Sequence, residues 1–242
     1  MNEVLKQLRD RKSVRVFCDR EIGDEEKLAI LRAATEAPTA GNQQLYTILD
    51  ITDRELKERL AISCDNQPFI AKAKLVLIFC ADCKKWYDAF CAAGCAPRLP
   101  EVGDLLLAVS DTNIAAQNAV TAAHSLGIGS CYIGDIMERY EEHRALLSLP
   151  DYVFPAAMVV FGYPTAQQLT REKPKRADLS HVVHKNGYRS MDEGELRRLF
   201  AKRCGIKGFE EYMGAFCQRK YNSDFSREMS RSVAKYLEQY QH

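Results

Sequence analysis

The first stretch that could do chemistry lies near the N-terminus, where Arg11, Lys12, Ser13 and Arg15 bring four donor side chains into five residues. Guanidinium and ammonium groups bind phosphate and other anions through charge-assisted hydrogen bonds. The spacing therefore predicts an anion site. A solvated basic turn is the alternative, since exposed charges contribute little by themselves.

Two turns rich in side-chain amides follow along the chain. In the first, Pro38 ends a helix, small residues follow, and three amides come at residues 42–44. In the second, Asn66 and Gln67 precede a proline. Such turns are ordinary loops, or they are surfaces with donors placed against a flat ligand.

A third stretch is rich in glycine, with Gly127, Gly129 and Gly134 around a short strand at residues 130–134. Glycine lets bare backbone approach a flat ligand closely. The stretch is not a dinucleotide fingerprint, because the third glycine is displaced and a helix, rather than a strand, precedes it.

Other chemistries find weaker support. A metal site is one of them, formed by four cysteines at Cys80, Cys83, Cys91 and Cys95. Their spacing is poor for a zinc ribbon, and no histidine lies nearby. A metal-binding helical adaptor stays an alternative function. The sequence contains no Walker motif, no paired-carboxylate signature and no recognisable nucleophile triad.

One long helix must position these stretches. It is predicted from Asp104, as N-cap, to Gly127, and apolar residues around most of its circumference predict burial on most sides. A membrane span is the competing interpretation, which Asp104 and Asp111 make poor.

The remaining elements predict an α+β fold rather than a regular βαβ alternation. Residues 81–103 have no long periodic pattern. We expect a mobile lid from Lys84 to Val102, with Trp86, Tyr87 and Phe90 shaping a ligand pocket; an ordinary connector is the alternative. Strands are predicted at 45–51, 75–80, 130–134 and 156–161, and further helices at 2–9, 24–35, 53–62, 192–203, 209–219 and 225–240.

Composition sets outer limits on the function. The 242 residues carry a net charge of +1, so the chain has no overall positive potential that would attract nucleic acid or an anionic membrane. Nine cysteines without an N-terminal apolar segment predict reduced thiols in the cytoplasm.

Four stretches, in this order and spacing, resemble the nitroreductase family. They are residues 11–17, residues 37–43, the long helix running into residues 129–134, and the basic residues 173–176 before a Val-Val-His. The resemblance implies a mixed sheet flanked by helices and an intertwined homodimer with the long helix at its interface. It also implies that the dimer holds the cofactor FMN.

The resemblance further implies which residues contact the cofactor. Arg11, Lys12, Ser13 and Arg15, with Lys173 and either Lys175 or Arg176, would hold the phosphate and the pyrimidine edge. The remaining contacts would come from Pro38, Thr39, Ala40 and Asn42 of the partner subunit, from Asn66 or Gln67, and from the backbone at Tyr132, Ile133 and Gly134, with Trp86 on the substrate side.

A chain of this family would transfer hydride from NADH or NADPH to FMN and then reduce a nitroaromatic, a quinone or another conjugated acceptor by ping-pong kinetics. Arg15 would act as an electrostatic stabiliser of the reduced, anionic flavin, and no protein acid or base and no metal is required. A flavin-binding sensor or carrier without turnover is the alternative.

The composition shifts near residue 188, which predicts a flavin-binding domain at 1–188 and a helical extension at 189–242. In the last helix, an apolar stripe from Phe225 through Met229, Val233 and Tyr236 to Tyr240 predicts docking. Because the elements of a complete core precede the extension, the stripe is expected to clasp a second subunit, with docking on its own subunit as the alternative.

Overall fold

The computed structural model describes residues 2–242, which form two compact units. One holds the chain up to Arg171 together with Glu228–His242, and the other holds Glu172–Arg227. The predicted division after residue 188 falls inside the second unit.

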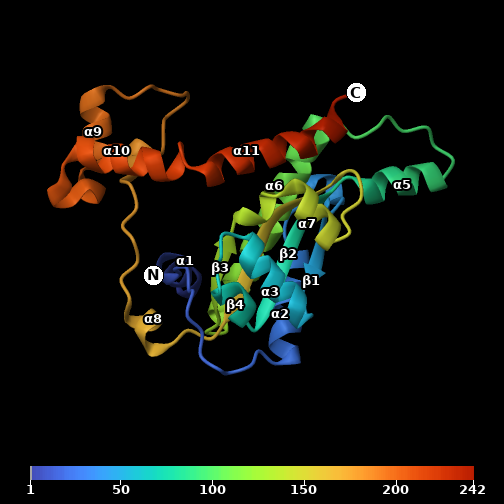
Figure 1. The fold of residues 1–242 in the computed structure, drawn as a ribbon, viewed down its shortest axis with the longest axis horizontal. Helices are drawn as coiled ribbons and strands as arrows, with labels where there is room; N and C mark the ends of the chain where they lie inside the picture. Colours follow the sequence, from blue (N-terminus) through green and yellow to red (C-terminus); the bar gives the residue numbers. More distant parts are fainter. Residues whose placement is uncertain (1) are drawn as a thin grey trace. The chain divides into compact units, whose positions relative to one another are not determined.

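The first unit is built on four strands: β1 (Tyr46–Asp50), β2 (Leu75–Asp82), β3 (Gly129–Ile133) and β4 (Val153–Gly162). Their order is β1-β2-β4-β3, and every neighbouring pair is antiparallel (Figure 1). The resemblance predicts a mixed sheet. Among the described residues, the parallel pairing is one isolated bridge, between Ser13 and Ser130. The α+β class is confirmed.

Strand β4 is longer than its apolar run indicated because it includes Pro155. The register between β2 and β4 shifts at Phe79 and Cys80, next to the proline. A bulge tolerates a residue that lacks the backbone donor, which lets a central strand continue through proline.

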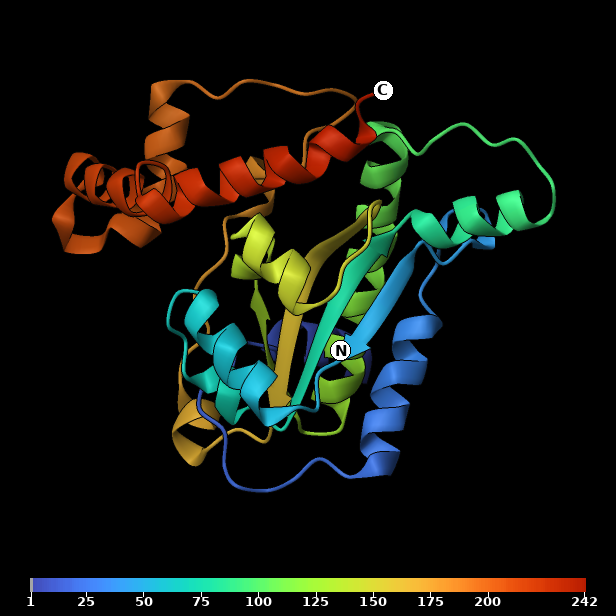
Figure 2. The ribbon, with the colours of Figure 1, turned by 45° about the vertical axis from the view of Figure 1, so that its right-hand side comes forward.

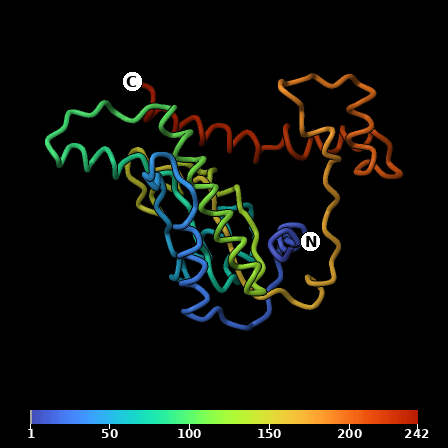
Figure 3. Tube along the Cα trace, turned by 180° about the vertical axis from the view of Figure 1, so that it is seen from behind, coloured from blue at the N-terminus to red at the C-terminus, as the bar shows by residue number. Residues whose placement is uncertain are grey.

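Helices cover both faces of this sheet (Figure 2). On one face, α2 (Asp24–Thr35) lies beside α6 (Val102–Ser125), as Figure 3 shows from behind. The other face is covered by α3 (Arg54–Ser63), α4 (Phe69–Lys72) and α7 (Tyr140–Leu146), with the short turn η2 (Asp135–Met137). Helix α1 (Glu3–Asp10) contacts α6.

Helix α6 begins earlier than predicted, at Val102. Asp104 is not the N-cap: its carboxylate accepts the N–H of the true N-cap, Glu101, at 2.8 Å and closes a capping box. The predicted burial holds for one side of α6, whereas Leu106 is 61% exposed and Leu107 and Ile114 are also exposed. No helix among residues 2–242 has the length and apolarity to cross a membrane.

The segment without a periodic pattern contains a short helix, α5 (Lys84–Ala92), and then irregular chain from Gly94, whose φ is 75°. It extends away from the sheet in Figure 2. A helix this short with no fully buried residue leaves little periodicity in the sequence, which is why it was not predicted.

Residues 13–17 cross the end of the sheet over a pair of glycines. Ser13 bridges to Ser130, and Gly129 pairs with Gly162 across β3 and β4. A Cβ at Gly129 would lie 2.6 Å from Val14 Cγ2, and a Cβ at Gly162 would lie 2.7 Å from Phe17 Cδ1. The crossing therefore requires residues without side chains at both positions.

The expectation that the tail finds its apolar partner outside its own core is wrong. The C-terminal part of α11 (Asp224–Leu237) belongs to the first unit. Tyr236 packs edge-on against Tyr140 and Phe154, with ring centroids 4.6 and 5.1 Å apart, and Tyr240 packs against Tyr152. The core before residue 188 thus leaves an aromatic surface on which the last helix packs.

The second unit contains α9 (Glu193–Cys204) and α10 (Phe209–Lys220), close to the predicted ranges. Throughout residues 172–227 only Cys204 is a buried apolar side chain, whereas the exposed apolar residues include Leu179, Val182, Val183 and Ile206. A unit with so small a core has little stability of its own.

Gly162→Ala should lower the free energy of unfolding by about 1–3 kcal/mol, because the new methyl group displaces Phe17. Urea unfolding measures the change. Gly103→Ala is the matched control, since it meets open space in the first turn of α6 and should be neutral or stabilising. Equal unfolding midpoints for both variants would show that the crossing tolerates a side chain.

Tyr236→Ala should lower the free energy of unfolding by about 3–5 kcal/mol, since it empties an aromatic cluster. Tyr236→Phe should cost little, because no described residue hydrogen-bonds the buried hydroxyl. Thermal unfolding of both variants measures the effect. A Tyr236→Ala protein as stable as the parent would mean that the tail contributes nothing to this unit.

Candidate functional site

The cationic residues predicted near the N-terminus gather around the start of β3. Burial raises the pKa of the Cys131 thiol, and the side chains of Arg15, Ser13 and Arg11 nearby oppose that rise. Burial also raises the pKa of Tyr132 to about 12, again opposed by Arg11. Three predicted site residues therefore gather beside β3, where Ser13 pairs with Ser130.

One nitrogen of the Arg11 guanidinium lacks a hydrogen-bond acceptor among the described residues. This nitrogen, Nη1, is buried. A buried, unpaired donor on a charged group is costly, and an anionic oxygen would satisfy it. The segment thus fits a phosphate-bearing ligand.

Lys12 is already engaged by backbone. Its ammonium donates to the carbonyl of Leu169 at 2.7 Å and to that of Arg171, while the Arg171 guanidinium donates to the carbonyl of Ser13. The backbone N–H of Arg15 donates to Gln168 Oε1 at 3.5 Å. These contacts give Lys12 a positioning role, and the sequence pattern did not single out Gln168 or Arg171 for it.

The second amide turn lies beside the cationic segment, because Arg15 and Pro68 line one cavity of about 790 Å³. Asn66 is exposed with φ of 50°, and Gln67 donates to the carbonyl of Cys64 at 2.8 Å. At the end of β3, Ile133 is buried and Gly134 is exposed.

The first amide turn is held by a carboxylate that the sequence did not reveal. Asp111, on α6, is 3% exposed and accepts hydrogen bonds from Thr39 Oγ1, from the N–H of Ala40 at 3.1 Å and from the N–H of Leu45 at 3.4 Å. Pro38 and Asn42 are exposed on this turn, and Asn42 has φ of 58°. Donors from the turn compensate the buried charge.

Within one chain these groups are not all brought together. The first amide turn leads into β1, and the cationic segment pairs with β3. Strands β1 and β3 are the opposite edges of the sheet (Figure 2). One site that uses both groups would therefore need a second chain.

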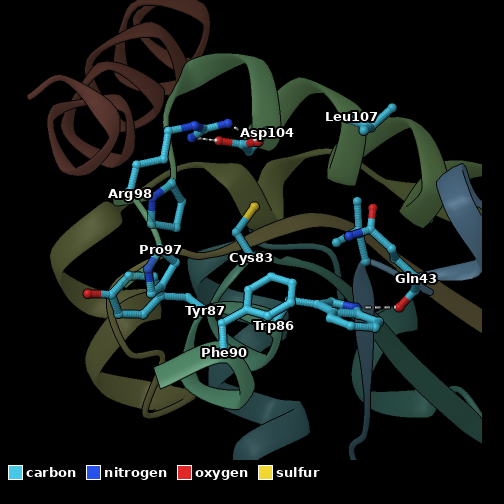
Figure 4. A pocket seen from close by; sticks show the side chains of 11 residues that line it. Gln43, Cys83, Trp86, Tyr87, Phe90, Pro97, Arg98, Asp104 and Leu107 are labelled. Carbon is cyan, nitrogen blue, oxygen red and sulfur yellow. Dashed lines mark hydrogen bonds and ion pairs between the residues drawn. The ribbon is translucent and has the colours of Figure 1, made fainter. Parts of the chain in front are cut away.

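A separate cavity of about 310 Å³ lies where α5 meets the first amide turn and α6 (Figure 4). The Trp86 indole N–H donates to the carbonyl of Gln43 at 2.8 Å, and Tyr87 and Phe90 line the same cavity. Arg98 pairs with Asp104 at the α6 side. The predicted placement of the three aromatic side chains at a pocket therefore has a geometric basis.

The remaining predicted residues lie elsewhere. Lys173, Lys175 and Arg176 belong to the second unit, and their contact with a phosphate stays a prediction. Cys80 and Cys83 are buried, whereas Cys91 and Cys95 are exposed. Among residues 2–242 no group of three or more His, Cys, Asp or Glu side chains is arranged to hold a metal.

This α+β fold, with its cationic crossing segment, belongs to a known family. The nitroreductase family matches residues 8–163, so this chain is a member of it, and the family prediction is confirmed. FMN reductase (NAD(P)H) of Bacillus subtilis is 31% identical over 98% of this chain and 92% of its own length. Oxygen-insensitive NADPH nitroreductase of Salmonella typhimurium is 34% identical over 82% of this chain and 80% of its own.

The similarity extends to solved structures. One from Bacteroides fragilis has a TM-score of 0.88 at 25% identity and covers 98% of this chain and 100% of its own. The predicted nitroreductase-like fold is therefore confirmed along nearly the whole chain.

Asp111→Asn should loosen the first amide turn, because an amide offers one acceptor oxygen where the carboxylate offers two. We expect a loss of about 1–3 kcal/mol in the free energy of unfolding and faster hydrogen exchange at residues 39–45. Ser110→Ala, on the exposed neighbouring position, is the control. Unchanged exchange in Asp111→Asn would contradict the positioning role.

Proposed function

We propose that this chain is an FMN-dependent NAD(P)H oxidoreductase that reduces nitroaromatics, quinones or related conjugated acceptors. The observation that carries the proposal is the buried, unpaired Arg11 nitrogen within the Arg11, Ser13 and Arg15 cluster. Relatives named for FMN reduction and for NADPH-dependent nitro reduction, over most of this chain, support it.

The residues have separate tasks in this proposal. Arg11 and Ser13 bind the phosphate, with Lys173 and either Lys175 or Arg176, and Lys12 keeps their segment in place. Arg15, beside Pro68, provides positive charge where negative charge develops, and Asn66 or Gln67 with the backbone of Ile133 and Gly134 orients the ring. When bound, FMN supplies hydride acceptance from NAD(P)H and electron transfer to the acceptor.

The cavity beside α5 receives the acceptor. Trp86, Tyr87 and Phe90 present aromatic faces and edges, which suit flat conjugated molecules (Figure 4). The hydrogen bond from Trp86 to Gln43 connects α5 to the first amide turn. Helix α5 and this turn therefore shape the cavity together.

A homodimer completes the site. Residues 38–42 of one chain join the cationic segment of the other, since one chain separates them at opposite sheet edges. The exposed Leu106, Leu107 and Ile114 of α6 provide an apolar face for the partner, and α1, which also contacts α6, exposes Val4 and Leu5. The exposed apolar residues of the second unit support the same assembly.

The proposal also places the protein in the cytoplasm. All nine cysteines are free thiols, as expected in a reducing compartment.

An absorption spectrum and one anaerobic titration test the function. The purified protein should show the two visible bands of oxidised flavin, NADH or NADPH should bleach them, and an added nitroaromatic or quinone should restore them. Bands that resist both nicotinamides would favour a flavin sensor or carrier. A protein that neither carries nor takes up FMN would refute the proposal.

Arg11→Ala and Arg15→Ala should each weaken FMN binding by about 1.5–3 kcal/mol, the contribution of a charge-assisted hydrogen bond. Fluorescence titration of flavin-free protein measures the affinity. Lys6→Ala removes an exposed cation from α1 and serves as the control. Affinities that match the control in both variants would remove the cationic segment from the site.

Trp86→Ala should change kcat/KM for the acceptor while flavin content stays unchanged, because the residue lines the acceptor cavity. Trp86→Phe keeps an aromatic ring but loses the hydrogen bond to Gln43, so it should fall between parent and alanine variant. Loss of flavin without a selective effect on the acceptor would assign Trp86 to packing.

A further inference from the structure

Glu138 is a buried carboxyl group that the proposed chemistry does not use. The residue is 5% exposed, and its Oε1 is buried with no hydrogen-bond partner among the described residues. A carboxylate in such a place has lost its hydration without gaining a donor. The neutral, protonated form avoids that cost.

The charged groups around Glu138 come from several elements. Asp135 of η2, Asp65 of the α3–α4 turn and Glu228 of α11 raise its pKa, and Arg139 opposes them. On α7, the two ring nitrogens of His143 hydrogen-bond the carbonyl of Ile136 at 3.0 Å and the hydroxyl of Ser63 at 2.8 Å, and burial lowers the pKa of the ring. Three carboxylates thus face Glu138, and one cation opposes them.

That cation is shared with other carboxylates. Arg139 pairs with Glu142 at 3.1 Å, and its backbone N–H donates to Glu228 at 3.1 Å. Glu228 and Glu141 are both engaged by Arg231 at 2.8 Å. Arg139 cannot therefore neutralise Glu138 alone. Burial and the neighbouring carboxylates raise the pKa of Glu138 to about 7.

The position of Glu138 links this charge to the proposed cofactor site. Asp65 immediately precedes Asn66, and Asp135 immediately follows Gly134, so the two facing carboxylates adjoin two predicted flavin-contacting turns. The N–H of Glu138 donates to the carbonyl of Asp135 at 3.0 Å, which closes the turn after β3. Repulsion at Glu138 would push against both turns at once.

We propose that Glu138 is a proton-linked positioning residue: protonated, it lets the turns at Asn66 and Gly134 pack closely, and ionised, it drives them apart and weakens FMN binding. The proposal rests on the proposed flavin site. No bond is made or broken beyond the carboxyl O–H, whose proton passes to solvent.

The sign of the pH dependence follows from the direction of the shift. In the unfolded chain the carboxyl group ionises near 4.5, and in the folded protein near 7. The folded state holds the proton over that interval, so the stabilisation is complete below about pH 4.5 and is lost as the pH rises through about 7. FMN affinity should fall as the pH rises through about 7 and above, where the flavin-free folded protein loses the proton.

The test compares the parent, Glu138→Gln and Glu25→Gln between pH 5.5 and 8.5; Glu25 is an exposed carboxylate in the first turn of α2 and serves as the control. Fluorescence titration should show that the parent and Glu25→Gln lose about five- to tenfold in FMN affinity across neutral pH, a coupling of ordinary size. Glu138→Gln should show no such loss. Asp65→Asn should move the inflection to lower pH, because it removes one of the repelling charges.

Thermal unfolding of the flavin-free proteins gives a second readout that needs no cofactor. The melting temperature of the parent should fall relative to that of Glu138→Gln as the pH rises from 5.5 to about 7, and the difference should be constant above that pH. If the melting temperatures of the parent and Glu138→Gln changed with pH in parallel, Glu138 would not take up a proton on folding, and the proposal would be overturned. A difference in melting without one in FMN affinity would overturn the positioning role, and failure of every variant to bind FMN would instead count against the proposed function.

Discussion

The proposed cofactor site depends on one close approach, the passage of residues 13–17 over Gly129 and Gly162. The two glycines are register partners on β3 and β4, and Val14 and Phe17 fill the space that their side chains would need. Ser13 is thereby fixed against Ser130, and the arginines on either side of Ser13 lie next to Cys131 and Tyr132. Packing thus holds the backbone of this basic turn in place, as the proposed contact with a phosphate requires.

Helix α6 carries a second constraint of comparable weight. Its buried carboxylate, Asp111, takes hydrogen bonds from the first amide turn, while Leu107 and Ile114, one turn before and after it, are exposed, as is Leu106. The same element thus shapes the turn that would contribute to a partner's site and offers an apolar surface to that partner. Cofactor binding and dimer formation would then stabilise each other by linkage.

Much of this architecture could be predicted because it depends on local patterns. Apolar runs gave β2 and most of β4, capping residues and periodicity placed the tail helices within about two residues, and the spacing of Arg11, Ser13 and Arg15 marked the cationic segment. Features set by tertiary contacts could not be predicted. The three donors to Asp111, the bulge that admits Pro155 and the aromatic surface under Tyr236 bring together residues far apart in sequence.

The central claim is that each flavin site takes its cationic segment from one chain and its first amide turn from the other. A differently tagged pair of chains tests it directly: one carries Arg11→Ala with Arg15→Ala, the other carries Thr39→Ala with Asn42→Ala. Each homodimer should bind FMN weakly. The purified heterodimer contains one intact site and one doubly altered site, so it should regain one tight FMN per dimer. A heterodimer that binds FMN no better than either homodimer would contradict the claim.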